Sequence, residues 1–193
     1  MKFVAAALVT VLMAAPCFAQ AALGDIPTRI AAYDDAVLAT MKAKGGLSVR
    51  ADRFEPIVRE YYDIPSMAAI VIGPKWAATS AEDRAAAIKA MTRHSALTLA
   101  RGFGTFDGQV FAVDPQIISR GTRRIVKVTI TTPGKKDLVF YQLRAGATWK
   151  IVDVISDGVS QLALQRADVA STISSGGAAA LVARFNKLDA VPR

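Results

Sequence analysis

The sequence contains few of the residue types that enzymes and metal proteins commonly use. Its 193 residues include a single cysteine, Cys17, and a single histidine, His94. Aromatic residues make up only 7% of the chain. Because Cys17 lies in an N-terminal segment that we expect to be removed, the rest of the chain has no disulfide, thiolate nucleophile or sulfur ligand for a metal. We therefore expect its stability to come from packing.

Acidic residues are outnumbered: 16 aspartates and glutamates face 24 lysines and arginines, for a net charge of +8, while 52% of residues are hydrophobic. This length and composition exclude a disordered tail, a collagen-like repeat and a two-domain enzyme, and favour one globular domain. A basic exported protein is expected to meet anionic membrane surfaces or lipid head groups. The basic stretches 101–104 and 120–124 resemble nucleic-acid contacts, but export argues against nucleic acid as a partner.

Only one long apolar run is present, from Val4 to Ala15, and Lys2 places a positive charge before it. Small residues follow near Ala19, so residues 1–19 are predicted to be a secretory signal peptide and residues 20–193 a single exported, periplasmic domain. A membrane-spanning helix is the alternative, but the run is shorter than the roughly 20 residues that a bilayer requires. Pro16, directly before Cys17, argues against a lipid anchor.

The spacing of apolar residues predicts helices on both sides of a central β region. Apolar residues recur every three or four positions, and proline or glycine pairs interrupt the pattern. Thr79 or Ser80 is expected to cap the longest helix. The predicted helices cover 27–44, 49–62, about 79–102, a stretch from Ser160 and a last one after Gly176-Gly177, with a short apolar segment at 67–72.

The central region alternates apolar and polar residues and is rich in β-branched and aromatic side chains. Val126, Val128 and Ile130 share one face of an expected strand, a pattern typical of a sheet with one buried side. Turns are expected at Pro133-Gly134 and Ala145-Gly146. The predicted fold class is α+β, with an antiparallel meander of about four strands at 109–113, 122–132, 137–144 and 149–156.

Catalytic patterns are weak. His94, Asp157 and Ser160 nominally supply a hydrolase triad, but Ser160 lacks the strand–turn–helix context that presents a nucleophile. Asp153 and Asp157 nominally supply a glycosidase pair, but carboxylates where a strand ends are more typical of turns and caps. One histidine and scattered carboxylates give no recurrent metal-ligand spacing.

Arg166 interrupts an otherwise apolar helical stripe that contains Leu162, Val169 and Ile173. One interpretation is structural: the side chain extends to solvent or pairs with Asp153 or Asp157. The other is functional, with the guanidinium binding an anion at the mouth of an apolar pocket.

Four blocks of sequence, spread over nearly the whole chain after residue 19, together form a recognisable pattern. The most specific is the run from Trp149 to Ser160, which reads Trp-Lys-Ile-Val-Asp-Val with Gly-Val-Ser after it. The others are Arg53–Ile57 with Tyr62–Met67, Val71–Trp76 with Thr79, and Arg166 with Gly176-Gly177 and Leu181. With Tyr141–Leu143, these blocks resemble the MlaC family of periplasmic lipid-carrier proteins, also called the toluene-tolerance family.

Three shorter segments, 73–76, 106–108 and 160–163, are most similar to the hopanoid-associated HpnM branch of that family. Val169 departs from the family pattern, since an aromatic residue is common at this position. A thinner pocket wall is expected there.

The resemblance implies helices packed on a curved antiparallel sheet, a deep apolar cavity for acyl chains, and neither catalysis nor a cofactor. It also implies partners: a phospholipid or hopanoid-like lipid, an inner-membrane ABC lipid transporter complex and an outer-membrane lipoprotein complex. Exposing two acyl chains of roughly 16 carbons to water costs on the order of 25 kcal/mol, so a carrier must shield them. The expected lipid-binding residues are Ile57, Tyr61, Met67, Ile70, Val71, Met91, Leu99, Val128, Ile130, Phe140, Trp149 and Arg166.

Two other functions remain open at this point. One is an exported lipid-modifying hydrolase that uses Ser160, His94 and an aspartate. The other is a module of the same fold that holds a protein partner instead of a lipid.

Overall fold

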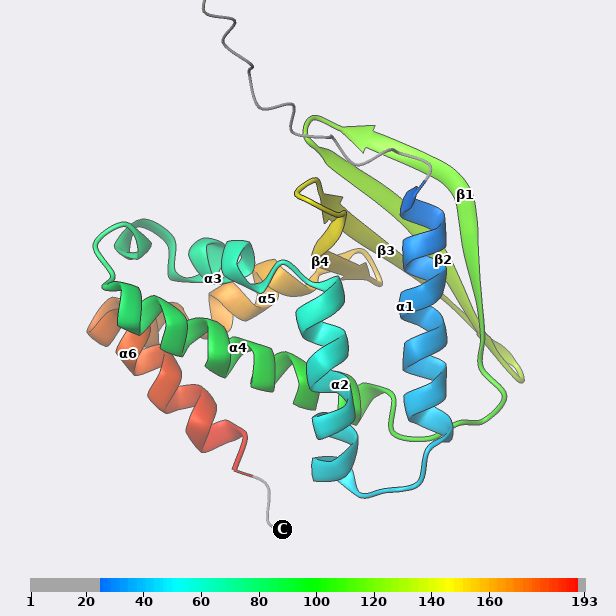
Figure 1. Cartoon of the computed structure of the whole chain (residues 1–193), viewed down its shortest axis with the longest axis horizontal. Helices are drawn as coiled ribbons and strands as arrows, with labels where there is room; N and C mark the ends of the chain where they lie inside the picture. Colours follow the sequence, from blue (N-terminus) through cyan, green and yellow to red (C-terminus); the bar gives the residue numbers. More distant parts are fainter. Residues whose placement is uncertain (1–24, 191–193) are drawn as a thin grey trace, which may run out of the picture.

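In the computed structural model, which describes residues 25–190, helices precede and follow one antiparallel sheet (Figure 1). The expected α+β class is confirmed. The helices are α1 (Asp25–Lys42), α2 (Leu47–Tyr61), α3 (Ile64–Ile72), the 3₁₀ helix η1 (Gly73–Trp76), α4 (Ala81–Gly102), α5 (Gln161–Asp168) and α6 (Ala170–Leu188). The strands are β1 (Val110–Arg120), β2 (Arg123–Thr132), β3 (Lys135–Arg144), β4 (Lys150–Ser156) and β5 (Val159–Ser160).

The strands pair in sequence order, from β1 to β5, and every pair is antiparallel. The sheet is therefore the expected meander, with the two-residue strand β5 added at one edge. Val126, Val128 and Tyr141 are buried on the face that the helices cover, as the alternation in β2 predicts. Figure 1 shows α1 lying alongside the long strands β1 and β2, and α4 and α6 farther from them.

Strand β1 is longer than the sequence predicts. The expected strand, 109–113, ended before Asp114-Pro115, but pairing with β2 resumes at Ile117 after a register shift. The interruption is a bulge: the Gln116 amide donates to Asp114 Oδ1 (2.9 Å), and Lys127 of β2 pairs with the same carboxylate (2.6 Å). The bulge therefore bends the strand without ending it.

The apolar segment expected at 67–72 is part of a helix, α3, which begins earlier. Asp63 caps it by accepting the Ser66 amide (3.2 Å), and Pro65 lies in its first turn, where no donor is needed. Gly73, with φ of 67°, ends it. The Asp63 amide also donates to the Ile151 carbonyl of β4 (2.8 Å), so the corner between α2 and α3 is attached to the sheet.

Two glycines divide α6 where the sequence places a break. Gly176 and Gly177 have non-helical backbone angles, and Gly177 has a positive φ of 59°. The second half of α6, which carries the buried residues Leu181 and Phe185, packs on α4.

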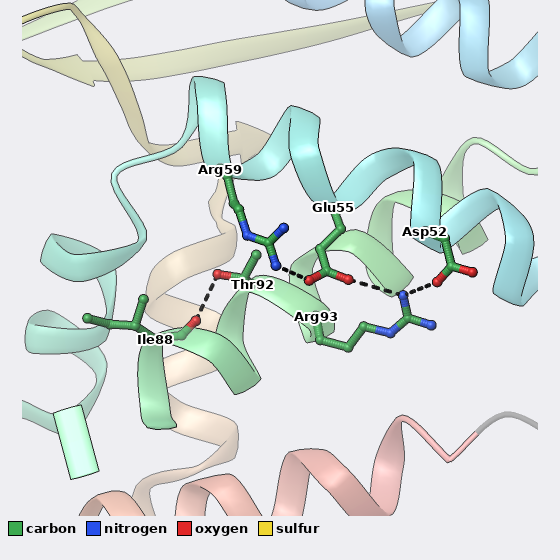
Figure 2. A network of polar contacts seen from close by, with 6 residues as sticks. All are labelled: Asp52, Glu55, Arg59, Ile88, Thr92 and Arg93. Atoms are coloured by element: carbon green, nitrogen blue, oxygen red, sulfur yellow. Dashed lines mark hydrogen bonds and ion pairs between the residues drawn. The ribbon is translucent and has the colours of Figure 1, made fainter. Parts of the chain in front are cut away.

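A chain of charged side chains joins α2 to α4 (Figure 2). Arg93 of α4 contacts Asp52 Oδ1 (2.6 Å) and Glu55 Oε2 (3.4 Å) of α2, and Glu55 also pairs with Arg59. Phe54 of α2 is fully buried, and its ring lies beside that of Phe103 at the end of α4. The charged network therefore lies over an apolar interface that carries most of the packing energy.

Within residues 25–190, no helix combines the length and the hydropathy needed to cross a bilayer. The predicted signal peptide, its cleavage site and Cys17 lie outside the residues that the structure describes.

Candidate functional site

A cavity of about 580 Å³ lies between the sheet and helices α4, α5 and α6. This volume is within the usual range of ligand-binding pockets, about 300–1,000 Å³. Most of its wall is apolar, with Met67, Leu99, Phe103, Ile130, Val139, Val154, Leu162, Leu164, Val169, Phe185 and Leu188. Its polar lining consists of Tyr33, Tyr62, Tyr141, His94, Ser95, Thr98, Asp153, Ser156, Gln161, Gln165, Asp168 and Arg184, with Gly102.

The lining side chains differ in exposure from one end of the cavity to the other. Leu164 and Leu188 are 47% and 50% exposed, so α5 and α6 form a mouth with apolar side chains at its rim. Tyr33 and Tyr141, in contrast, are 1% and 2% exposed. The cavity therefore leads from an open mouth to an inner end beneath α1.

Three tyrosines make this inner end polar. The hydroxyls of Tyr33 and Tyr62 share a hydrogen bond of 2.8 Å, and the Tyr33 ring packs edge-on against those of Tyr62 and Tyr141. Burial is the largest cause of a raised pKa in all three, and it raises that of Tyr62 to about 12. The three phenols therefore remain protonated.

Asp34, next to Tyr33 on α1, is the most unusual buried group of the described residues. It is only 2% exposed, does not line the cavity, and makes no hydrogen bond of normal geometry through its carboxyl oxygens. Burial, followed by the charge of Asp35, raises its pKa to about 7, although the nearby Tyr141 hydroxyl opposes this shift. Its charge in turn helps to raise the pKa of Tyr33, Tyr62 and Tyr141, so the carboxyl lies among the phenols.

Asp153 is also a buried carboxylate, but both of its oxygens accept hydrogen bonds. It accepts the Ser160 hydroxyl (2.7 Å) and the Leu162 amide (3.1 Å) at the start of α5. Ser160 in turn accepts the Ala163 amide (3.0 Å) as the N-cap of that helix. Both side chains therefore fix α5 as a wall of the cavity.

The nominal triad does not assemble. His94 Nδ1 lies 2.9 Å from Asp189 Oδ1, and its ring stacks on Phe185 with centroids 4.1 Å apart. Ser160 has Asp153 and the helix backbone as partners, and Asp157 occupies the exposed turn between β4 and β5 with a φ of 52°. The pair Asp153 and Asp157 accordingly has a capping role and a turn role.

Arg184, which was not among the expected site residues, is the one lysine or arginine that lines the cavity. Its side chain is exposed at the mouth, and among residues 25–190 it has neither an ion pair nor a hydrogen bond. The sequence gives only one indication that Arg184 faces the cavity: it follows the buried residue Leu181 by three positions on α6.

Arg166, which was one of the expected lipid-binding residues, lies elsewhere. It is exposed, does not line the cavity, and forms no ion pair with Asp153 or Asp157 in the described part of the chain. Its guanidinium lies beside Gly73, where a Cβ would be 3.6 Å from Nη2.

Of the twelve expected lipid-binding residues, Met67, Leu99 and Ile130 line the cavity. Four of the others are buried in the core: Val71, Met91, Val128 and Trp149. Three pack against the core from partly exposed positions: Ile57, Tyr61 and Ile70.

Phe140 lies on the other face of the sheet. It alternates with Val139 and Tyr141, which line the cavity, and pairs with Lys127 of β2. Because successive strand residues point to opposite faces, its side chain is directed away from the cavity. Val139, Tyr141 and Leu143 alternate in the same way, and that pattern identifies the inward face of β3.

Val169, where the family pattern often has an aromatic residue, does line the cavity and is 2% exposed. A small side chain at this position leaves space that a ring would fill.

A second cavity, of about 660 Å³, lies between α2, α3, α4 and the turn between β3 and β4. Four cations line it, Arg59, Lys89, Arg144 and Lys150, together with Asp63. Arg59 also belongs to the charged network of Figure 2. Tyr62 lines both cavities and so lies between them.

Among residues 25–190, no three histidine, cysteine or carboxylate side chains are grouped as metal ligands would be. The lining of the first cavity suits a mainly apolar ligand, with polar groups at the inner end and Arg184 at the mouth.

An open antiparallel sheet and surrounding helices that enclose such a cavity define an α+β ligand-binding domain. The chain belongs to the MlaC family, because the profile described as MlaC protein matches residues 32–187. It is also similar in fold to the solved structure of a phospholipid-binding protein from Ralstonia solanacearum in complex with a phospholipid, with a TM-score of 0.74 and 20% identity over 85% of this chain and 96% of that one. A search of the curated proteins gives no match.

Proposed function

We propose that this protein is a periplasmic lipid carrier that holds the acyl chains of a phospholipid or hopanoid-like lipid in the 580 Å³ cavity. The observation that carries the proposal is the cavity itself, which is mainly apolar and opens at Leu164 and Leu188. Membership of the MlaC family and the similar fold of the Ralstonia solanacearum phospholipid-binding protein support it.

In this proposal, the acyl chains enter between α5 and α6 and the head group stays at the mouth. Arg184 lies there without another partner and offers a guanidinium to the lipid phosphate. The exposed leucines at the rim would contact a membrane or a partner while the chains pass. Transfer would run between an inner-membrane ABC transporter complex and an outer-membrane lipoprotein complex, with residues 1–19 directing export.

The test is to release the bound molecule from the purified chain under denaturing conditions and to weigh it by mass spectrometry. A carrier should release about one lipid per chain, with the same mass as intact membrane lipids. It should also move a labelled phospholipid between two populations of vesicles. Chain without lipid that also fails to transfer lipid would contradict the proposal.

The same experiment separates the carrier from a lipid-modifying hydrolase. A hydrolase would release products that lack an acyl chain, and His94→Ala would abolish them. In the proposed carrier, His94 stacks on Phe185 and pairs with Asp189, so His94→Ala should leave the mass of the released lipid unchanged.

A further inference from the structure

The second cavity gathers positive charge from distant parts of the chain. Its wall contains four cations, Arg59, Lys89, Arg144 and Lys150, and one carboxylate, Asp63. Arg59 lies in α2 and Lys89 in α4, whereas Arg144 ends β3 and Lys150 begins β4. The fold thus leaves an excess of three positive charges around a cavity of about 660 Å³.

Both lysines of this wall lack an anionic partner within residues 25–190. Lys89 is exposed and has neither an ion pair nor a hydrogen bond there. The Lys150 ammonium donates to the Arg59 carbonyl (3.0 Å), an uncharged acceptor that uses one of its three protons. The Arg59 guanidinium itself pairs with Glu55 of the same helix. The two lysines therefore bring uncompensated charge to the cavity.

Two of the cations are direct neighbours in the sheet. Arg144 of β3 and Lys150 of β4 are paired in register, and like charges at paired positions repel. Asp63 Oδ2 lies 3.7 Å from Arg144 Nη1, too far for a hydrogen bond, while Asp63 Oδ1 accepts the Ser66 amide at the start of α3. Among residues 25–190, no carboxylate at hydrogen-bond distance offsets this repulsion.

A phosphate group matches the charge and the donors of this wall. A phosphomonoester carries nearly two negative charges at pH 7, and its oxygens accept from several ammonium and guanidinium groups at once. A single carboxylate would neutralise less of the excess. An acidic peptide spreads its charges along an extended chain, whereas these four cations surround one cavity. An acyl chain would remove water from the cations without replacing its hydrogen bonds.

We propose that the second cavity binds a phosphate group, of a soluble phosphate ester or of a lipid head group in a membrane, through Arg59, Lys89, Arg144 and Lys150. The two cavities have only Tyr62 in common, and Arg184 lines the first alone. The phosphate site is therefore separate from the cavity for acyl chains, and it does not depend on which cargo that cavity holds.

Calorimetry with glycerol 3-phosphate tests the site on the purified protein, with acetate and glycerol as comparison ligands. Glycerol 3-phosphate should bind about tenfold more tightly than acetate because it carries more charge and more acceptors, and glycerol should not bind. High salt should weaken the binding by screening. The Arg184→Gln protein should bind glycerol 3-phosphate as the wild type does.

Two matched variants locate the binding. Lys89→Gln removes one charge from the cavity wall and should weaken binding of glycerol 3-phosphate about tenfold. Because Lys89 is exposed and without a partner among residues 25–190, its melting temperature should not change. Lys136→Gln is the control: Lys136 is equally exposed and unpaired in that part of the chain, but it lines neither cavity, so binding should persist.

Vesicle flotation identifies the source of the phosphate. If a lipid head group occupies the site, vesicles of phosphatidylcholine with phosphatidic acid should retain the wild type and the Lys136→Gln protein, and should retain less of the Lys89→Gln protein. If the source is a soluble ester, Lys89→Gln should weaken the binding of glycerol 3-phosphate and leave flotation unchanged. Either result supports the phosphate site.

Three results would overturn the inference. The first is equal binding of acetate and glycerol 3-phosphate. The second is binding of glycerol 3-phosphate that Arg184→Gln abolishes and Lys89→Gln leaves intact, which would place the phosphate at the first cavity. The third is tighter binding of hexaglutamate than of glycerol 3-phosphate, which would indicate an acidic protein partner. None of them affects the carrier proposal, which the mass of the released lipid tests independently.

Discussion

The hydroxyls of Tyr33 and Tyr62 lie 2.8 Å apart and join α1 to the corner between α2 and α3. Both side chains are buried, so each hydroxyl depends on the other for this bond. The contact therefore links two helices that the chain brings together over the inner end of the cavity.

Removal of both hydroxyls should cost less than the sum of the two single removals. Tyr33→Phe or Tyr62→Phe leaves a buried phenol without its partner and should lower the free energy of unfolding by about 1–2 kcal/mol. The double variant removes both polar groups and should cost less than the sum of the two single changes. Denaturant unfolding of the four proteins measures this coupling; additive costs would contradict it.

Asp34 should make stability depend on pH. Its pKa rises from 3.8 in the unfolded chain to about 7 in the fold, chiefly through burial. Between those values the folded state holds a proton that the unfolded state lacks, so the free energy of unfolding should fall by about 3 kcal/mol from pH 4 to pH 7. Above about pH 8, where the folded carboxyl is also ionised, this contribution is constant.

Asp34→Asn should remove that slope. The variant should be more stable than the wild type at pH 8 and closest to it at pH 4, as thermal unfolding at each pH would record. Asp35→Asn is the matched control, because the neighbouring Asp35 is exposed and its loss should leave most of the slope. Parallel curves for the wild type and Asp34→Asn would show that the carboxyl does not titrate in this range.

A larger side chain inside the cavity should displace lipid. Ile130→Trp projects into the cavity from β2 and should reduce co-purified lipid several-fold while the fold persists. Val128→Trp, at a fully buried position, should instead cost roughly 1–3 kcal/mol or more. Phe140→Trp, on the opposite face of β3, is the control and should keep its lipid. Equal lipid content in all three variants would place the ligand elsewhere.

Arg184 and Arg166 should differ in their effect on phospholipid binding. Arg184→Gln removes the one arginine at the mouth and should weaken phospholipid binding about tenfold, because a hydrogen-bonded ion pair with the phosphate is lost. Arg166→Gln, outside the cavity, should leave binding unchanged. Vesicle-transfer assays on both variants measure this, with melting temperatures to exclude unfolding. The reverse result would assign the head group to Arg166.

The sequence predicts most of the fold because its elements depend on local patterns. The alternation of Val126, Val128 and Ile130 identifies the inward face of β2, and the double glycine at 176–177 marks the break in α6. The predicted end of β1, at residue 113, was wrong. Asp114-Pro115 has the composition of a turn, and only pairing with β2 shows that it forms a bulge.

The site is less predictable because it depends on which faces meet. Met91 and Leu99 occupy one helical stripe, yet only Leu99 reaches the cavity. Arg166 was predicted to bind lipid because it interrupts an apolar stripe, but it does not line the cavity. Arg184 follows an ordinary helical pattern, yet it lines the mouth. The burial of Asp34 cannot be predicted from the sequence, because it depends on the packing of α1 near Tyr141 of β3.

The order of the strands has a consequence for how the chain folds. Each strand from β1 to β5 pairs with its neighbour in sequence, so the sheet forms through short loops, whose closure costs little entropy. The two walls of the cavity differ: α1 and α6 come from opposite ends of the described chain and reach it only through distant contacts. We expect the hairpins to form early and the enclosure of the cavity late, because local contacts speed folding and distant ones slow it.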